Sequence, residues 1–333
     1  MDRSRPHVRI TPNLIGIAFG IAGLAQVWST ANAVAQSPEW VATSLWLLAG
    51  IAWLVTAGPY VVRGVLTRQL WADLADPIFS PFTALAFIVP MLLGVELARY
   101  QRGLGETIFF IALALTVLLG GWLSGEWIVV EASLAQWHPG YFLPTVAGGL
   151  IGAAGCAQLG YLSLARFMFG YGMICWLVLG SILLTRLFTQ PRLPIPLLPT
   201  MAIEVAPPVV AGGAWFAING SQPDAVALGL AGYGVLMVMV QLRLIPLYAG
   251  VPFGVGWWSF SFSYAAAFSV GIRWLGVEQV PGQQALTYLL LAVVTAGIAA
   301  LLFRTVVGLR RGTFLPRQSA VPEHRKVSGR QGR

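Results

Sequence analysis

The sequence predicts an all-α integral membrane protein with about ten transmembrane helices, because it is poor in charge and is divided into long apolar stretches. Of its 333 residues, 57% are hydrophobic and only 10% are charged. A soluble domain carries roughly 25% charged residues, since water must wet its surface. Lipid must therefore be the solvent for most of the surface of this chain.

Ten stretches have the roughly 20 predominantly apolar residues that a membrane span needs. They are 12–35, 41–62, 78–98, 106–128, 141–161, 165–187, 198–219, 224–243, 253–274 and 285–308. The connections between them are short, and the longest, 63–77, cannot hold a soluble domain. We therefore predict a short N-terminal segment over 1–11, one membrane domain over 12–308, and a basic, disordered tail over 309–333.

The distribution of basic residues predicts the orientation, because loops on the cytoplasmic side carry an excess of Lys and Arg. With ten spans and a cytoplasmic N-terminus, 16 of the 20 basic residues fall on the inner side. The outer side holds the other four, which are Arg99, Arg102, Arg166 and Arg273. Both termini are predicted to be cytoplasmic.

Prolines divide the ten stretches into two sets. Proline removes a backbone hydrogen bond from a helix, which in lipid is tolerated mainly where protein or a water-filled cavity replaces it. Among the even-numbered stretches only Pro59 lies within a span. The odd-numbered stretches are thus predicted to form an inner set and the even-numbered ones an outer ring, unless the prolines reflect only their higher frequency in membrane helices. Within the odd-numbered stretches, the prolines at which helices are expected to bend are Pro81, Pro90, Pro144, Pro207 and Pro208.

Closely spaced glycines in some of the odd-numbered stretches give weak support to the same division. Gly16, Gly20 and Gly23 lie in the first, and Gly148 begins a series of four in the fifth. Small residues spaced three or four apart allow helices to pack closely, and they also leave a lumen open if they face one. Both interpretations of Gly16, Gly20 and Gly148 stand at this point.

Glu204 is the most notable ionisable residue within a predicted span, where such groups are costly and often functional. It could line the cytoplasmic mouth of a pore, pair with Arg243 or Arg186, or titrate during transport. The alternative is a partly hydrated glutamate near a helix end. Glu96, at the end of another stretch, could simply pair with Arg99 or Arg102.

Several classes of function lack the residues they need. The four aspartates include only one poor imitation of a diphosphate-binding motif, Asp73 and Asp76, and neither a P-loop nor a metalloprotease motif occurs. Two cysteines and three scattered histidines offer no metal cluster. The net charge of +8 lies mostly in the terminal segments rather than in a patch. We expect no catalysis, no metal or other cofactor, and no nucleic-acid partner.

An aromatic run in the ninth stretch, Trp257–Tyr264, contains candidates for a gate. Phe262 and Trp258 share one helix face, while Phe260 and Tyr264 share another. Aromatic rings can close a lumen sterically or by dewetting. Helix packing or a belt at the membrane interface would explain the same run.

Five motifs, in order along the chain, resemble those of the TehA-type tellurite-resistance/dicarboxylate transporter family, which includes the plant slow-type anion channels. The resemblance extends from the first span to the tenth. One departure is Gly16–Gly20 (GIAFG), where the family often has a proline, and another is Ser263, where plant members have a proline. The motifs are His138–Pro144 (HPGYFLP), Gly170–Trp176 (GYGMICW), Pro199–Met201 with Ala206–Pro207, Gln241–Pro246 (QLRLIP) and Gly256–Phe262 (GWWSFSF).

The resemblance implies five helical hairpins around a central pore, with odd-numbered helices inside, assembled as a homotrimer in the bacterial inner membrane. It implies transport of small anions and assigns the occluding phenylalanine to Phe262. Pro90, Pro144, Pro207, Pro208 and Phe260 are further candidates for pore lining or kinks, with Glu204 and Arg243 at the pore mouth. The expected function is a small-anion channel, with tellurite resistance as an expected phenotype. The alternative is a transporter or exporter of C4-dicarboxylates or of sulfur or tellurium oxyanions, proton-coupled through Glu204.

Overall fold

The computed structural model describes residues 10–129 and 133–315, and every regular element in these ranges is helical. The all-α prediction is therefore confirmed. A short helix, α3 (Gln69–Ala75), lies in the connection predicted at 63–77. The long helices are α1 (Gly16–Ala35), α2 (Glu39–Leu66), α4 (Leu85–Leu97), α5 (Arg102–Val129), α6 (Gly148–Gln158), α7 (Leu162–Thr189), α8 (Ala206–Asn219), α9 (Ala225–Ala249), α10 (Ser259–Val277) and α11 (Gln283–Arg310).

Nine helical segments of the described chain are long and apolar enough to cross a membrane. They correspond to nine of the ten predicted stretches. The remaining stretch, 253–274, contains α10, whose 19 residues include four serines and Arg273. These polar residues lower the hydropathy of this segment, and it does not qualify as a membrane span by length and composition. The count of ten spans therefore stays a prediction.

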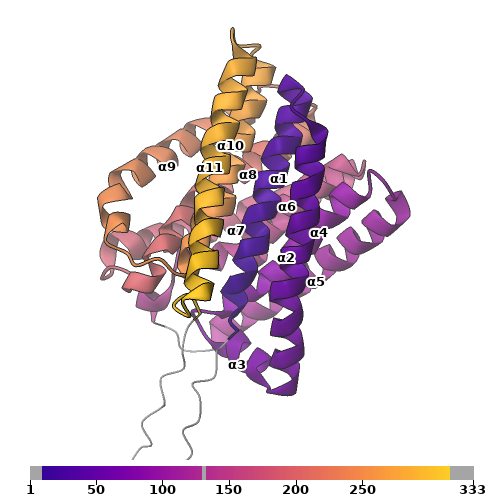
Figure 1. Cartoon of the computed structure of the whole chain (residues 1–333). Coiled ribbons are helices and arrows are strands. Elements are labelled where there is room, and N and C mark those ends of the chain that lie inside the picture. Colours follow the sequence, from indigo (N-terminus) through magenta and orange to yellow (C-terminus); the bar gives the residue numbers. More distant parts are fainter. Residues whose placement is uncertain (1–9, 130–132, 316–333) are drawn as a thin grey trace, which may run out of the picture.

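The helices pair in order along the chain, and the first member of each pair contributes to a closed ring. The pairs are α1 with α2, α4 with α5, α6 with α7, α8 with α9, and α10 with α11. Within the ring, α1 contacts α4, α4 contacts α6, α6 contacts α8, α8 contacts α10, and α10 returns to α1. Figure 1 shows α1 between the hairpin partner α2 and the last pair, α10 and α11.

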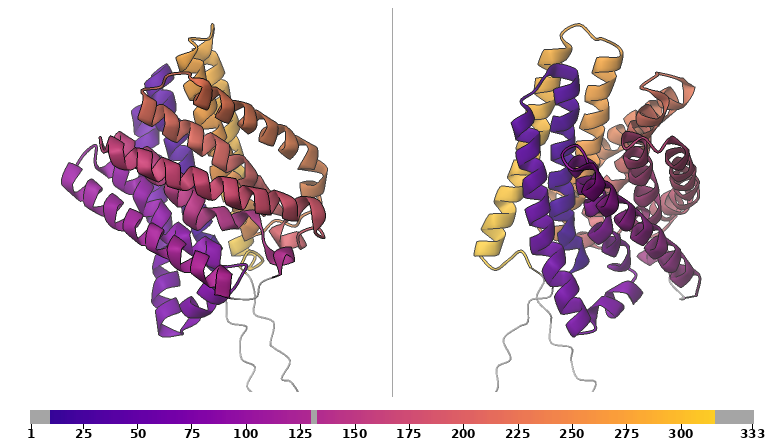
Figure 2. Two further views of the ribbon diagram at one scale, coloured as in Figure 1. Left: turned by 180° about the vertical axis from the view of Figure 1, so that it is seen from behind. Right: turned by 90° about the vertical axis from the view of Figure 1, so that its right-hand side faces the viewer.

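Burial separates the two sets of helices as the prolines predicted. In the most apolar 18-residue window of each span, 67–83% of the residues are buried in the four inner spans, against 22–33% in the five outer ones. The left view of Figure 2 shows α5 and α7 running obliquely across the outside of the molecule. The outer helices α2, α5, α7, α9 and α11 thus present their apolar side chains to lipid.

Each inner helix starts with a short 3-10 or π-helical segment at the same end of the molecule. Proline occupies one of the first two positions in four of these segments, where its missing N–H costs no helical hydrogen bond. The segments are η1 (Pro12–Ile15), η2 (Ser80–Ala84), the π-helical η5 (Leu143–Ala147), η6 (Ile195–Val205) and η7 (Val255–Trp258).

The proline pattern needs one correction. The sequence places only Pro59 inside an even-numbered span, but α9 continues to Ala249 and contains Pro246 as well. Pro246 lies in the last turn of a helix that ends before the loop at Gly250, so the one carbonyl that loses its helical partner is that of Leu242, one turn earlier. Internal proline is therefore enriched in the inner set but is not confined to it.

Hydrogen bonds between side chains tie the inner helices to one another and to their neighbours. Thr30 of α1 and Ser269 of α10 lie 2.8 Å apart, and the Trp28 indole donates to Thr295 of α11 at 3.1 Å. Trp258 donates in the same way to Thr305 at 3.0 Å. In lipid, where no hydrophobic force drives helices together, such bonds add to close packing.

The first and last described residues lie at one end of the molecule, which we call the terminal end; the opposite end is the distal end. The Gln69 amide donates to the Ile10 carbonyl at 3.2 Å, which fixes the start of the described chain beside α3 (Figure 1). The helix α11 ends at Arg310, two residues beyond the predicted boundary at 308. Most of the predicted tail 309–333 lies outside the described residues.

Candidate functional site

Two cavities lie within the ring of inner helices, one toward each end of the molecule. The cavity near the terminal end, which we call the apolar cavity, has a volume of about 520 Å³. The cavity toward the distal end, the polar cavity, has a volume of about 780 Å³. Residues of all five inner helical segments contribute to both walls.

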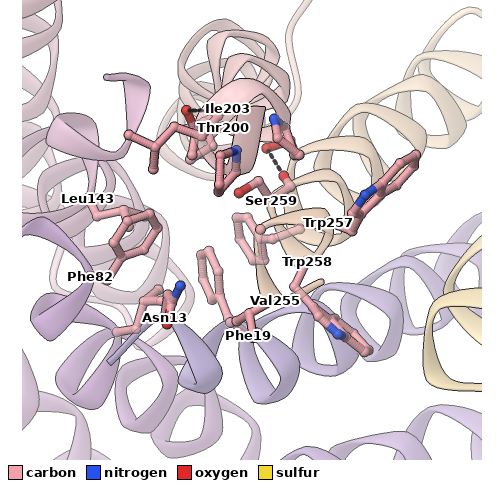
Figure 3. Close-up of a pocket in the computed structure, with 18 of the residues that line it drawn as sticks. Asn13, Phe19, Phe82, Leu143, Thr200, Ile203, Val255, Trp257, Trp258 and Ser259 are labelled. Atoms are coloured by element: carbon pink, nitrogen blue, oxygen red, sulfur yellow. Dashed lines mark hydrogen bonds between the residues drawn. The ribbon is translucent and has the colours of Figure 1, made fainter. Parts of the chain in front are cut away.

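Among the described residues lining the apolar cavity, none is charged. Phe82, Leu143 and Ile203 form much of its wall, and Figure 3 shows Phe19 pointing into the space between them. The chain after α11 closes one side through Thr313–Leu315. A hydrated ion entering this cavity finds few groups that replace its water.

The polar cavity has a different lining. Glutamines, serines and a threonine supply amide and hydroxyl groups, and Arg273 and Glu96 are the two charged residues among those that line it. Arg99 pairs with Glu96, with Nη1 and Oε1 3.1 Å apart, and also with Glu39 at 2.8 Å. The predicted pairing of Glu96 with Arg99 is therefore confirmed.

Phe262 of α10 and Val210 of α8 line both cavities and thus lie between them. The Phe262 ring is only 6% exposed. It stacks on the ring of Phe19 from α1, with centroids 3.6 Å apart and planes inclined by 12°. A pair of stacked rings therefore separates the two cavities.

Glycines of α1 allow these rings to meet. A Cβ atom at Gly20 would overlap the side chain of Ser261, and one at Gly23 would lie 3.0 Å from both Phe262 Cδ2 and Ala265 Cβ. The small residues bring α1 and α10 together along the length of the stack. For Gly20, the structure favours the close-packing interpretation over the open-lumen one.

The other glycine and proline candidates also divide into residues that line a cavity and residues that do not. Gly16 and Pro207 line the apolar cavity. Gly148 faces Thr116 of the outer helix α5 instead, since its added Cβ would lie 2.5 Å from the threonine methyl carbon. Pro144 lies in η5 and Pro208 near the start of α8, both buried, and Pro90 lies within α4. None of Pro90, Pro144 and Pro208 is among the residues that line either cavity.

Phe260 lies on the face of α10 turned away from both cavities. Its ring contacts Tyr248 edge to face, with centroids 4.9 Å apart, and stacks with Trp257 and Tyr264. This cluster packs α10 against η6 and the end of α9. The structure therefore gives Phe260 a packing environment and Phe262 a position between the cavities.

Glu204 and Arg243 lie apart from the cavities and from each other. Glu204 is buried in η6, and its Oε1 atom has no hydrogen-bond partner among the described residues. Arg243 is exposed on α9. Neither lines either cavity, and no ion pair between Glu204 and Arg243 or Arg186 occurs in the described part of the chain.

Sequence reasoning missed three residues of this site: Phe19, Val210 and Arg273. Phe19 was noted only as part of the departure from the family motif at Gly16–Gly20. Arg273 was counted among the basic residues of outer loops, although Phe262, Ala266, Ser269 and Arg273 follow helical spacing along one face. That spacing was the available signal. No comparable signal pointed to Val210, which stands among other small apolar residues of α8.

His138 contacts two residues in the wall of the apolar cavity, Ile78 and Phe82. Its Nδ1 atom accepts a bond from the Gly140 amide at 3.1 Å, so the neutral ring carries its proton on Nε2, 3.2 Å from the Ile78 carbonyl. The ring also stacks on Phe82. Burial lowers the pKa of His138 to about 4, and the positive charge of Arg186 acts in the same direction.

No three His, Cys, Asp or Glu side chains come together as a metal site within residues 10–129 and 133–315. The residues that line the cavities also offer no pair of groups arranged as a nucleophile and its base. What the arrangement can do is admit a small solute from either end and stop it at the ring pair.

Comparisons with known proteins place the chain among anion transport proteins. Residues 9–306 match the voltage-dependent anion channel family. A tellurite resistance protein TehA homolog of Haemophilus influenzae is 28% identical over 301 residues, which cover 90% of each chain. The S-type anion channel SLAH3 of Arabidopsis thaliana is 27% identical over 325 residues, 92% of this chain and 49% of the plant protein. The guard cell S-type anion channel SLAC1 of the same plant is 24% identical over 324 residues, 90% and 56% of the two chains.

Proposed function

The chain belongs to the voltage-dependent anion channel family, and we propose that it passes small anions through the ring of inner helices with Phe262 as the gate. The observation that carries this proposal is the position of Phe262. It is shared by both cavities, is almost completely buried, and is stacked on Phe19. An anion crossing from one cavity to the other must displace that ring.

The closed gate acts through size and through dewetting. The stacked rings, together with Val210, leave no polar atom to replace the water around an ion at this level. Opening requires Phe262 to leave the stack and turn toward the wall. Stacked aromatic pairs contribute about 0.5–1.5 kcal/mol beyond their buried area, so the pair with Phe19 biases the gate toward the closed state.

Selectivity for anions has support in the direction of the inner helices. All five inner helices begin at the terminal end, and residues at or next to their first positions line the apolar cavity: Gly16, Leu85, Ala147, Ala206 and Ser259. The N-terminal end of a helix carries about half a positive charge. Five such ends favour an anion in a cavity that holds no side chain able to bind it tightly.

We place the terminal end in the cytoplasm, because it carries most of the basic residues. The Haemophilus influenzae relative supports a bacterial protein, and the family resemblance supports the inner membrane and a homotrimer with one pore per subunit. The name of that relative also supports a contribution to tellurite resistance. The chain spans only about half the length of the plant channels.

The experiment that tests the proposal measures anion current through purified protein in planar bilayers under a chloride gradient. We expect Phe262→Ala to raise the conductance at least about tenfold, with a reversal potential close to that of chloride, because the occluding ring is gone. Phe260→Ala is the matched control, since it removes a ring of the same helix that faces neither cavity. Equal currents in native protein and Phe262→Ala, with both folded, would contradict a gate at Phe262.

A second candidate function rests on Glu204. A buried carboxyl with an unpartnered oxygen in a membrane span is a candidate proton carrier. In that case the protein would be a proton-coupled transporter of C4-dicarboxylates or of sulfur or tellurium oxyanions. Uptake into vesicles would then follow an imposed proton gradient and would be lost in Glu204→Gln.

A further inference from the structure

The polar cavity contains one positive charge, and its position on α10 is specific. Arg273 is the only basic residue among the described residues that line either cavity. It follows Phe262 by eleven positions on the same helix face, which places it about 16 Å along the helix axis from the gate. Ala266 and Ser269 lie between them on that face, and both line the polar cavity.

Arg273 is not neutralised within the part of the chain that the structure describes. Arg99 forms ion pairs with Glu39 and Glu96, and Arg102 with Glu106, whereas no described acidic side chain pairs with Arg273. Glu96, the acidic residue of the cavity, is thus already paired with Arg99. The guanidinium of Arg273 is only partly exposed, so its positive charge acts in a confined space.

The surrounding groups suit a small anion that keeps part of its water. Gln26, Gln158 and Gln283 supply amide groups to the same cavity, and Ser29 and Ser269 supply hydroxyls. A guanidinium has five N–H donors and no acceptor, so it can bind an anion but not a cation. Confined surroundings with little water strengthen its attraction over that of an exposed arginine.

We propose that Arg273 forms an anion-binding subsite in the polar cavity, which holds a small monovalent anion such as chloride before it passes the gate or after it has done so. The inference rests on the proposed channel function and adds a binding step to it. The subsite raises the local anion concentration on the distal side of Phe262. The apolar cavity relies on helix ends instead and has no such residue.

The test uses the full chain with Phe262→Ala, so that the gate does not limit the current. The half-saturating chloride concentration is measured with chloride supplied from the distal side. We expect Arg273→Gln to raise it about fivefold, the effect of losing one unit charge about 4 Å from the ion in a water-like medium. Arg273→Lys retains the charge and should restore most of the affinity.

Arg166→Gln is the matched control, because it removes an exposed arginine predicted on the same side but outside the cavity. Chloride supplied from the terminal side gives a second comparison, in which Arg273→Gln should change the half-saturating concentration less. If Phe262→Ala conducts and Arg273→Gln behaves like Arg166→Gln, the subsite is wrong and the channel stands. If folded Phe262→Ala carries no current, the proposed function itself is wrong, and the subsite with it.

Discussion

The two cavities show how one ring of helices creates two environments for the same solute. The apolar cavity is lined by phenylalanines, prolines and aliphatic side chains at the terminal end, where five helices begin. The polar cavity lies where the same helices end, and its wall contains glutamines, hydroxyls and Arg273. Among the described residues, only Phe262 and Val210 contribute to both.

In the proposed channel, the ring pair that blocks the pathway and the polar groups that bind an anion therefore lie in different parts of the molecule. In the apolar cavity an anion meets the diffuse potential of helix ends, which does not hold it tightly. In the polar cavity it meets localised donors. A channel needs binding that is favourable enough for the ion to enter and weak enough for it to leave, and placing donors on only one side of the rings meets both needs.

The largest effect, on thermal stability, is expected from a substitution that prevents α1 from packing closely against α10. Gly20→Leu would force a side chain into Ser261, and overpacking of this kind costs about 3 kcal/mol or more. Thermal unfolding in detergent should show a marked loss of folded protein. Gly121→Leu on the outer helix α5, where an added Cβ meets nothing within 4 Å, should leave stability nearly unchanged.

Acid should weaken the wall of the apolar cavity through His138. The ring has a pKa of about 4 when folded and about 6.5 when unfolded, so the unfolded chain binds the extra proton between these values. Stability is therefore complete above pH 6.5 and falls as the pH drops toward 4, by up to about 3 kcal/mol.

Unfolding temperatures of native protein and His138→Gln, measured from pH 7.5 to 4.5, check this expectation. The variant should be less stable at pH 7.5 because it lacks the ring that stacks on Phe82. Its own pH dependence should be flatter. Parallel curves for the two proteins would show that His138 is not the titrating group.

A smaller effect is expected from weakening the ring pair between the cavities while Phe262 itself is kept. Phe19→Ala deletes the ring on which Phe262 stacks. An aromatic pair of about 0.5–1.5 kcal/mol corresponds to a roughly two- to tenfold rise in the open population, which single-channel recordings would measure. Phe19→Tyr keeps a stacking ring and should resemble the native protein.

The smallest effect is expected at Glu204, which lines neither cavity. Glu204→Gln should change the chloride conductance of Phe262→Ala by less than about twofold, since removing a charge outside the pathway alters no group that the ion meets. Current recordings at fixed chloride would check this. A large loss of flux would instead favour the proton-coupled transporter.

Much of the architecture was predictable because membrane spans obey local rules. Apolar length located nine of the spans, and the prolines at positions such as Pro81 and Pro144 marked the inner set. Pro246 showed the limit of that rule, because the end of α9 could not be located from hydropathy. The ninth stretch, 253–274, does not meet the hydropathy criterion because it contains polar residues that line the cavities: Ser259 and Ser263 line the apolar cavity, and Ser269 and Arg273 line the polar one.

The candidate site was only partly predictable. The family resemblance assigned Phe262 as the gate, and its position between the cavities supports that assignment. The same resemblance could not distinguish Phe260, two positions earlier, by its surroundings. Glu204 was singled out as an ionisable residue within a span, but it lines neither cavity. The basic residue that lines the polar cavity is Arg273, which was assigned to a loop.

By itself, the sequence determined that the chain is helical, that lipid surrounds it, and which helices turn inward, because each of these depends on the composition of one segment. The tertiary structure decided what meets at the centre. Thr30 and Ser269 are bonded across 239 positions of the chain, and Phe19 and Phe262 of the same two helices stack on each other. Such contacts depend on how closely two helices can pack, and the small glycines of α1 and serines of α10 set that distance.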